Sequence, residues 1–244
     1  MSIIKNNFIM QNKSNYQDLL KCFAILAMIV DHIGLYIFPE NSAMRLLGRC
    51  AMPIFCFFAG YNFNGLPKLK IFIWGVGLYI ITTCLLRKFT PTNILISIFL
   101  GQCYLYLYRN KLPNINVSYV HLFILWLLSI VTINFFDYGT LVIAVMILGF
   151  IASKHSEYLK ISILFSIALP MLSSTFLIFN FTDLYVYILI VLAILEYFIM
   201  NLIKFDKKIL LNINIISRNS LYIYVVHLII LQAVFVYYIQ SDKF

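Results

Sequence analysis

The segment LLKCFAILAMIVDHIGLYIFP, residues 19–39, decides the fold class of this chain. A run of about 20 apolar residues is long enough to cross the hydrocarbon core of a bilayer as one α-helix. Asp31 and His32 interrupt the run, and ionisable groups at membrane depth are costly, so they usually face a partner or a cavity. The segment therefore predicts a membrane-spanning helix that carries a polar site in its second half.

The composition extends this prediction to the whole chain. Of 244 residues, 63% are hydrophobic and 11% are charged, whereas soluble domains have about half and about a quarter. These values exclude a soluble domain, a nucleic-acid-binding domain and a disordered tail. Polar and Pro-containing breaks between apolar runs predict an all-α polytopic bundle of about nine helices, within a range of eight to ten. The helices are expected at 19–39, 44–63, 69–86, 92–108, 119–135, 139–153, 159–178, 184–203 and 217–238.

The positions of the basic residues predict the orientation in the membrane. Lys and Arg normally accumulate in cytoplasmic loops, and a cytoplasmic N-terminus with nine spans places 13 of the 18 basic residues on that side. We therefore expect an N-in/C-out topology. The charge is spread over five segments, which argues against a nucleic-acid partner. The 13 residues are Lys5, Lys13, Lys21, Lys68, Lys70, Arg109, Lys111, Lys154, Lys160, Lys204, Lys207, Lys208 and Arg218.

The cysteines and the shortest helix give two further expectations. The five cysteines stand singly in apolar runs, with no CxxC and no Cys/His cluster, so they indicate buried apolar packing and neither disulfides nor a metal site. The segment 139–153 is the shortest of the predicted helices, and a re-entrant helix is an alternative to a full span there.

Costly polar residues occur at four places in the predicted spans. They are Asp31 with His32, Arg45 with Arg49, the run that contains Asn219, Tyr224 and His227, and Glu196. Arg45 and Arg49 are four residues apart and share one helix face, and the turn at Pro39 brings the second helix back beside the end of the first. Two guanidinium groups near Asp31 and His32 are expected to form a charged pocket in the outer half of the membrane. Such a pocket suits a carboxylate, a phosphate or a carbonyl that becomes an oxyanion.

Structural interpretations of the same residues remain open. Asp31 can pair with Arg45 or Arg49 merely to fix helix packing, and a histidine in a bundle can simply hydrogen-bond across helices. Pro53 leaves the carbonyl of Arg49 without its helical partner, which gives the pocket a free acceptor.

The last helix and the membrane boundary add smaller predictions. Tyr224, three residues before His227, is a better angular match to that histidine than Tyr222. Glu196 can meet the tyrosines of the last helix or a water-filled cavity. Lys21, beside the point where the first helix enters the membrane, is expected to be interfacial.

Two motifs carry a resemblance to a known family. LKCFAILAMIVDHIG (20–34) followed by RLLGRCAMPIFCF (45–57) resembles the signature of the TraX family of integral membrane proteins, an LK-x-(apolar)-DHIG helix and then an R-x-x-GR-x-x-FP-x-F helix. Weaker matches at 93–95, 137–139 and 221–228 follow in the expected order. Met52 stands where the family often has Phe, and Gly60-Tyr61-Asn62 replaces an acidic residue plus Gly.

The resemblance implies an acyltransferase related to the acyltransferase-3-like group, in the inner (cytoplasmic) membrane of a bacterium. It implies acetyl-CoA as the donor, and membrane lipid and an envelope protein or glycan as partners. The acceptor is then a pilin N-terminus or a surface glycan. It also implies three parts: a cytoplasmic tail (1–18), one transmembrane acyltransferase-like domain (19–238) and a short C-terminal tail (239–244). The implied catalytic pair is His32 and Asp31, and the implied substrate-binding residues are Arg45, Arg49, His227, Tyr224 and Asn219, with no metal.

Acyl transfer needs a base for the acceptor and donors for the oxyanion. We expect His32 to be the base, Asp31 to orient a partner or balance an arginine, and Arg45 or Arg49 to hold the acyl carbonyl or the phosphates of the donor. Direct transfer is favoured over a covalent relay through His or Cys50, because an isolated cysteine is a weak candidate nucleophile.

Two other functional classes remain. In a proton-coupled transporter, Asp31, His32, His227 and Glu196 form a proton relay, although no inverted repeat is visible in the sequence. In a noncatalytic assembly factor for a surface appendage, the polar pocket only holds helices together.

Overall fold

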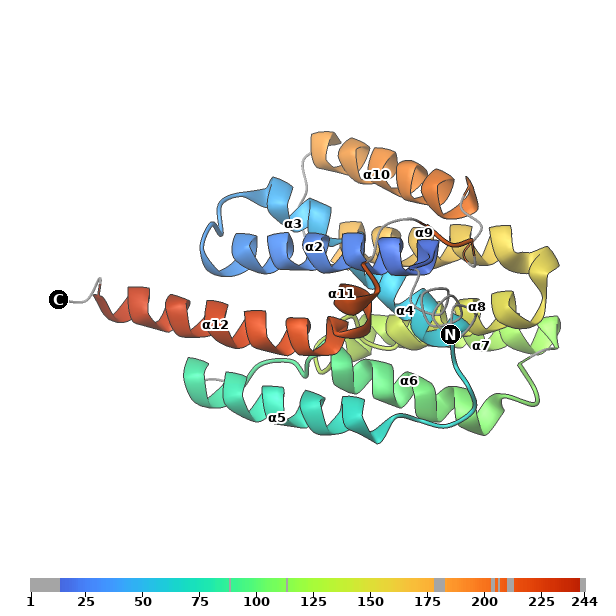
Figure 1. Ribbon diagram of the computed structural model, residues 1–244, viewed down its shortest axis with the longest axis horizontal. Helices are drawn as coiled ribbons and strands as arrows, with labels where there is room; N and C mark the ends of the chain where they lie inside the picture. The colour runs from blue at the N-terminus through green and yellow to red at the C-terminus, as the bar shows by residue number, and fades with distance from the viewer. Residues whose placement is uncertain are drawn as a thin grey trace, which may run out of the picture.

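The computed structural model describes residues 14–87, 89–112, 114–177, 183–202, 205, 207–209 and 213–241. Within these ranges the regular structure is helical, with two isolated β-bridges and no strand, which confirms the predicted all-α class. Figure 1 shows the long helices lying side by side along the long axis of the molecule. The helices are α2 (Tyr16–Tyr36), α3 (Ser42–Gly48), α4 (Ala51–Tyr61), α5 (Leu69–Leu86), α6 (Ile94–Tyr108), α7 (Ile115–Thr132), α8 (Leu141–Lys154), η1 (Ser156–Tyr158), α9 (Leu159–Leu177), α10 (Asp183–Leu202), α11 (Asn214–Arg218) and α12 (Ser220–Ser241).

Several helices have the length and composition of membrane spans. Four segments qualify among the described residues, namely Tyr16–Tyr36, Ser42–Tyr61, Leu69–Leu86 and Ser220–Tyr238, and shorter apolar helices accompany them. The exposed hydrophobic side chains on α5, α7 and α10 are those that a bilayer covers. The chain is therefore a membrane protein.

The second predicted helix, 44–63, is divided into α3 and α4. Arg49 and Cys50 form a turn between them, and Pro53 is the third residue of α4. Proline lacks an N–H, and its ring clashes with the carbonyl four residues earlier, which here belongs to Arg49, so the helix must restart at this point. After this break α4 lies in the centre of the bundle, where it packs against α8.

Helix α8 forms the centre of the core. Residues 141–152 of this helix are all buried except Ile143, which is half-buried, and α8 packs against α4, α6, α7 and α9. The segment that was expected to be short and was open to a re-entrant interpretation is one unbroken helix of 14 residues.

Glycines allow α4 and α8 to pack backbone to backbone. A Cβ atom at Gly60 would lie 1.9 Å from the carbonyl oxygen of Met146, and one at Gly149 would lie 2.1 Å from the carbonyl oxygen of Phe57. Apolar side chains gain little by leaving lipid, so membrane helices depend on such close contacts between small residues. This contact fixes α4, and with it the wall of the cavity described below.

We predict that Gly149→Ala lowers the thermal stability of the protein, because α4 and α8 must separate to admit the methyl group. Overpacking of this kind costs about 1–3 kcal/mol. Gly77→Ala is the matched control, since a Cβ atom there meets nothing within 4 Å. The measurement is thermal unfolding of the purified protein in detergent; equal melting temperatures for the two variants contradict the prediction.

Candidate functional site

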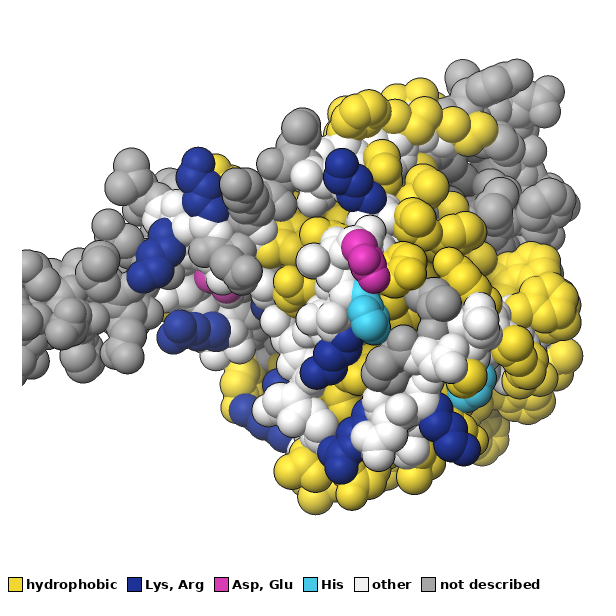
Figure 2. All heavy atoms as spheres, turned by 90° about the vertical axis from the view of Figure 1, so that its right-hand side faces the viewer, with side chains coloured by type: hydrophobic (Ala, Val, Ile, Leu, Met, Phe, Trp, Pro, Cys, Tyr) yellow, Lys and Arg dark blue, Asp and Glu magenta, His cyan; other side chains and the backbone are white. Residues whose placement is uncertain are grey.

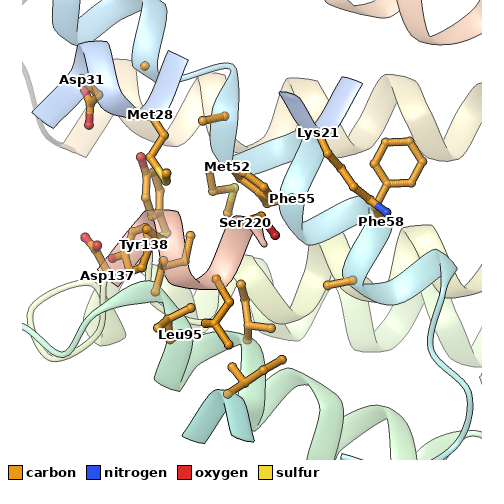
Figure 3. A pocket seen from close by; sticks show the side chains of 18 of the residues that line it. Lys21, Met28, Asp31, Met52, Phe55, Phe58, Leu95, Asp137, Tyr138 and Ser220 are labelled. Carbon is orange, nitrogen blue, oxygen red and sulfur yellow. The ribbon is translucent and has the colours of Figure 1, made fainter. Parts of the chain in front are cut away.

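A cavity of about 360 Å³ lies between α2, α4, α6 and the start of α12. Figure 3 shows Lys21 and Phe58 at one end, Asp31, Asp137 and Tyr138 at the other, and apolar side chains such as Met28 and Leu95 between them. The cavity is therefore elongated and carries polar groups at both ends. His32, Arg45, Arg49 and Tyr224 also line it.

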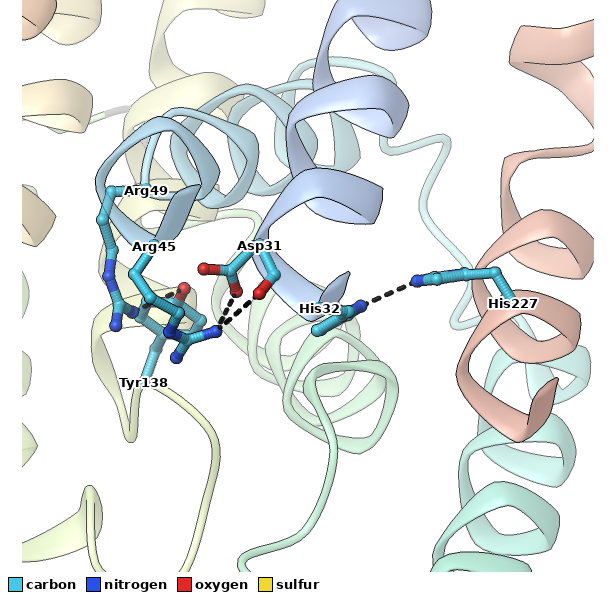
Figure 4. Close-up of polar contacts among 6 residues, drawn as sticks. All are labelled: Asp31, His32, Arg45, Arg49, Tyr138 and His227. Atoms are coloured by element: carbon cyan, nitrogen blue, oxygen red, sulfur yellow. Dashed lines mark hydrogen bonds and ion pairs between the residues drawn. The ribbon is translucent and has the colours of Figure 1, made fainter. Parts of the chain in front are cut away.

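Asp31 and Arg45 form an ion pair at the wall of the cavity. Arg45 Nη1 lies 2.8 Å from Asp31 Oδ2, and the same nitrogen donates a 3.1 Å hydrogen bond to the backbone carbonyl of Asp31 (Figure 4). The other carboxylate oxygen, Oδ1, is buried and has no hydrogen-bond partner within the described ranges. Of the two arginines open to Asp31 in the sequence, Arg45 is thus the partner.

Glycines bring the two helices of this pair together. A Cβ atom at Gly48 would lie 2.1 Å from the Cβ of Asp31, and one at Gly34 would lie 2.8 Å from the Cβ of Met44. The DHIG and GR motifs therefore have a packing function in addition to their polar residues: each glycine makes room for the other helix.

His32 forms a directed chain of hydrogen bonds with His227. His32 Nδ1 lies 2.7 Å from His227 Nε2, and His227 Nδ1 lies 2.7 Å from the carbonyl oxygen of Ile223 (Figure 4). A carbonyl only accepts, so His227 Nδ1 carries a proton, and Nε2 of neutral His227 is then an acceptor. His32 must donate from Nδ1 to that acceptor. In the neutral pair, Nε2 of His32 is therefore the nitrogen with a free electron pair.

Arg49 is directed to a different partner. Its Nη1 donates a 3.0 Å hydrogen bond to the hydroxyl oxygen of Tyr138, and the guanidinium carbon lies 5.7 Å from the centre of that ring. Arg45 and Arg49 were expected to lie in one charged pocket, and both line the cavity, where Arg45 pairs with Asp31 and Arg49 donates to Tyr138.

Tyr138 is a site residue that the sequence analysis quoted only as part of a motif. It has φ +60° and is followed by Gly139 with φ +54°, a conformation that non-glycine residues seldom adopt and that concentrates at functional sites. The loop is held by Thr92, which exchanges backbone hydrogen bonds with Phe135 and Asp137. The strained backbone beside a cavity was not detectable from residue types alone.

The hydroxyl of Tyr138 is protonated at neutral pH because of its buried position. Burial raises the pKa of Tyr138 to about 12, with Arg49 opposing the shift, so the hydroxyl retains its proton at neutral pH. Desolvation likewise raises the pKa of Asp137 to about 6, again opposed by Arg49. Because the oxygen of Tyr138 accepts from Arg49, its own O–H is left to donate elsewhere.

Comparisons with known proteins agree with the motifs that form this site. The family model described as TraX protein matches residues 16–235, which include every residue of the cavity wall named above. The chain belongs to the TraX family. It is 47% identical over 237 residues to an uncharacterized protein of Rickettsia prowazekii (strain Madrid E), covering 94% of this chain and 96% of that protein. No solved structure matches the chain.

The TraX site brings together only part of the set predicted from the sequence. The ring of Tyr224 lies 6.0 Å from that of His32 and 5.9 Å from that of His227. His227 supports His32 and does not itself line the cavity. The amide of Asn219 donates to the carbonyl of Ile215, and its exposed side chain lies outside the cavity lining, so the structure does not support its predicted role in substrate binding.

Two further residues lie away from the TraX cavity. Glu196 on α10 is 5% exposed, and the thiol of Cys50 is the contact of its carboxylate in the described part of the chain. It lies next to Cys50, which is buried and outside the cavity lining. The relay predicted for a transporter, with Glu196 joined to the histidines, is therefore not assembled in this structure. Among the described residues, no three His, Cys, Asp or Glu side chains lie close enough together to hold a metal ion.

We predict that Asp31 and Arg45 are energetically coupled. Asp31→Ala leaves a guanidinium without its ion-pair partner and should lower the free energy of unfolding by about 3 kcal/mol, and Arg45→Met should have a comparable effect. The double variant removes both charges and should recover at least about 1 kcal/mol relative to the sum of the single changes. Thermal or denaturant unfolding in detergent measures this double-mutant cycle. Strictly additive effects would show that the ion pair does not hold the helices together.

Proposed function

We propose that this TraX protein is an integral membrane acyltransferase of the acyltransferase-3-like kind. It transfers an acetyl group from acetyl-CoA to an amine or hydroxyl of an envelope protein or glycan. The observation that carries the proposal is the directed chain from Ile223 through His227 to His32. It leaves His32, at the cavity wall, with an unprotonated Nε2, which is the group that a general base requires.

His32 supplies proton transfer in both halves of the proposed reaction. The acceptor nitrogen or oxygen attacks the thioester carbonyl carbon while its proton moves to Nε2 of His32. The tetrahedral intermediate then expels the thiolate as the C–S bond breaks, and the proton passes from Nε2 to sulfur. The hydrogen bond from Nδ1 to His227 persists throughout and holds the ring in one orientation.

Tyr138 and Arg49 are suited to the oxyanion. The O–H of Tyr138 is available to donate, and the hydrogen bond from Arg49 increases its acidity. Donors fixed in place before the reaction stabilise a developing oxyanion more than mobile water does. Asp31 neutralises Arg45, so this pair positions α2 and α3 and stays outside the chemical step.

The proposed topology has nine spans and a cytoplasmic N-terminus in the bacterial inner membrane. The nine are α2, α3 with α4, α5 to α10 in order, and α12. Figure 2 views the end of the molecule where α2 begins, and Lys and Arg side chains gather around it. The loops and helix ends there carry Lys68, Lys70, Arg109, Lys111 and Lys154. Basic residues favour the cytoplasmic side, from which acetyl-CoA arrives, whereas the acceptor enters from the opposite side or from the lipid.

Transfer from radiolabelled acetyl-CoA in membranes that contain the protein tests the proposal. The unsubstituted protein should label an envelope acceptor, and His32→Ala should lower the rate by about 10²–10⁴-fold, because the base is lost. His227→Leu removes the acceptor that fixes the tautomer and should also lower the rate, whereas His227→Gln retains a hydrogen-bond acceptor and should lower it less. Full transfer by His32→Ala refutes the assignment of the base. Solute or proton flux without label would instead support the transporter.

We predict a separate effect for Tyr138→Phe. Loss of the hydroxyl should reduce kcat by about 10²-fold with little change in KM, because the donor acts on the transition state. Tyr104→Phe is the control, since that hydroxyl hydrogen-bonds His121 away from the cavity lining. Steady-state kinetics measure both variants, and melting temperatures show whether Tyr138→Phe remains folded. An unchanged kcat rules out Tyr138 as an oxyanion donor.

A further inference from the structure

Lys21, which the sequence predicts to be interfacial, is half-buried and lines the cavity near the start of α2. It stands in the second turn of α2 and lines the cavity, with its Nζ 5.6 Å from the centre of the Phe58 ring. Within the described ranges its ammonium group makes no hydrogen bond and no ion pair. A cation in a membrane helix normally reaches the interface or a partner, so this one calls for an anion that enters the cavity.

The carboxylate near Lys21 belongs to Asp18, and it already accepts hydrogen bonds from other groups. Asp18 accepts hydrogen bonds from the backbone N–H of Asn15 and from the hydroxyl of Ser217. The first contact belongs to the capping box of α2, and the second ties α11 to that helix. Asp18 thus holds two helix ends together, and the three N–H donors of Lys21 remain available.

A second cation lines the same end of the cavity. Lys68 precedes α5, and its backbone N–H donates a 2.8 Å hydrogen bond to Oε1 of the buried Gln102. The first turn of α5 has no side-chain cap, so its N–H groups and the positive end of the helix dipole lie beside Lys68. This end of the cavity is therefore positive and rich in donors.

The distance between the two ends of the cavity is close to the length of the arm of coenzyme A. Lys21 and His32 are eleven residues apart on one helix, which corresponds to about 16 Å along its axis. The arm that joins the pyrophosphate of coenzyme A to its sulfur is about as long as four extended residues, or about 14 Å. Apolar residues such as Met28, Met52 and Leu95 line the space between the ends (Figure 3).

From this arrangement we infer that Lys21 and Lys68 form a phosphate-binding subsite for the nucleotide end of a coenzyme A thioester, whose arm extends through the cavity to His32. The inference rests on the proposed function. It identifies the phosphates of coenzyme A as the part of the donor that the protein recognises at this end of the cavity. Ammonium groups bind phosphate through charge-assisted hydrogen bonds, which are stronger than neutral ones. A donor without phosphates would lose this contact and keep the contacts at His32.

Binding of coenzyme A to the purified protein is the first test. We expect Lys21→Met to weaken binding by about 10- to 100-fold, which corresponds to the loss of one or more charge-assisted hydrogen bonds. Lys70→Met is the matched control, because Lys70 lies over the ring of Tyr222 outside the cavity lining. Calorimetry in nanodiscs of phosphatidylcholine alone excludes anionic lipid headgroups as competing phosphates.

Kinetics with two donors provide the second test. Lys21→Met and Lys68→Met should raise KM for acetyl-CoA and leave KM for acetyl-pantetheine, which lacks the phosphates, unchanged. If the unsubstituted protein neither binds coenzyme A nor transfers acetyl groups, the proposed function fails. If it does both, and Lys21→Met binds coenzyme A equally tightly or raises KM for both donors alike, this inference alone is overturned.

Discussion

The ion pair between Asp31 and Arg45 is the contact on which the rest of the site depends. A carboxylate and a guanidinium at membrane depth must find each other, because lipid offers neither of them a hydrogen bond. Their pairing locks α2 against α3, and Gly48 permits the approach. Once these helices are fixed, Arg49, one turn after Arg45, faces Tyr138, and His32, next to Asp31, faces α12. One compensated charge pair thereby sets the directions of three other polar groups.

The two ends of the cavity carry different kinds of polar groups. Several residues near Asp31 pair with one another, and the groups they leave available include the Nε2 of His32 and the O–H of Tyr138. At the opposite end Lys21 lies over the ring of Phe58 and makes no hydrogen bond or ion pair among the described residues, and Lys68, which lines the same end, is exposed. The paired groups fix the shape of the cavity, whereas the available groups can bind a ligand. An elongated ligand with an anionic group at one end and a reactive carbonyl at the other is complementary to both ends of the cavity.

The sequence predicted the helical class and the location of the site, but it did not predict which side chains of the site pair with one another. Apolar periodicity and the cost of buried charge were sufficient to place Asp31, His32, Arg45 and Arg49 in one pocket. They could not decide which arginine pairs with Asp31, because both lie on one helix face, whereas in the structure they contact different partners. Spacing within a helix is readable from sequence, whereas the partner across helices depends on packing.

Other residues of the site show the same limit. Tyr138 lies in a loop, and its role follows from a positive φ and from the hydrogen bonds of Thr92, neither of which residue type predicts. Lys21 has the usual position of an interfacial lysine, and only the tertiary structure shows that it lines the cavity. Asn219 is close in sequence to the tyrosines of α12, yet its amide caps its own helix turn.

For the proposed acyl transfer, the placement of Cys50 bears on whether the route is direct or passes through a cysteine. Arg49 and Ala51 line the cavity, but Cys50 between them is buried, 4% exposed, and lies next to Glu196 on the side of α10. A thiol that does not reach the cavity cannot accept an acyl group from a donor bound there without rotation of the α3–α4 turn, which Pro53 and the ion pair of Arg45 restrain. His32 faces the cavity and can exchange one proton with acceptor and leaving group in turn. In the proposed reaction, direct transfer therefore requires no movement of the bundle, and this geometry favours it over a cysteine relay.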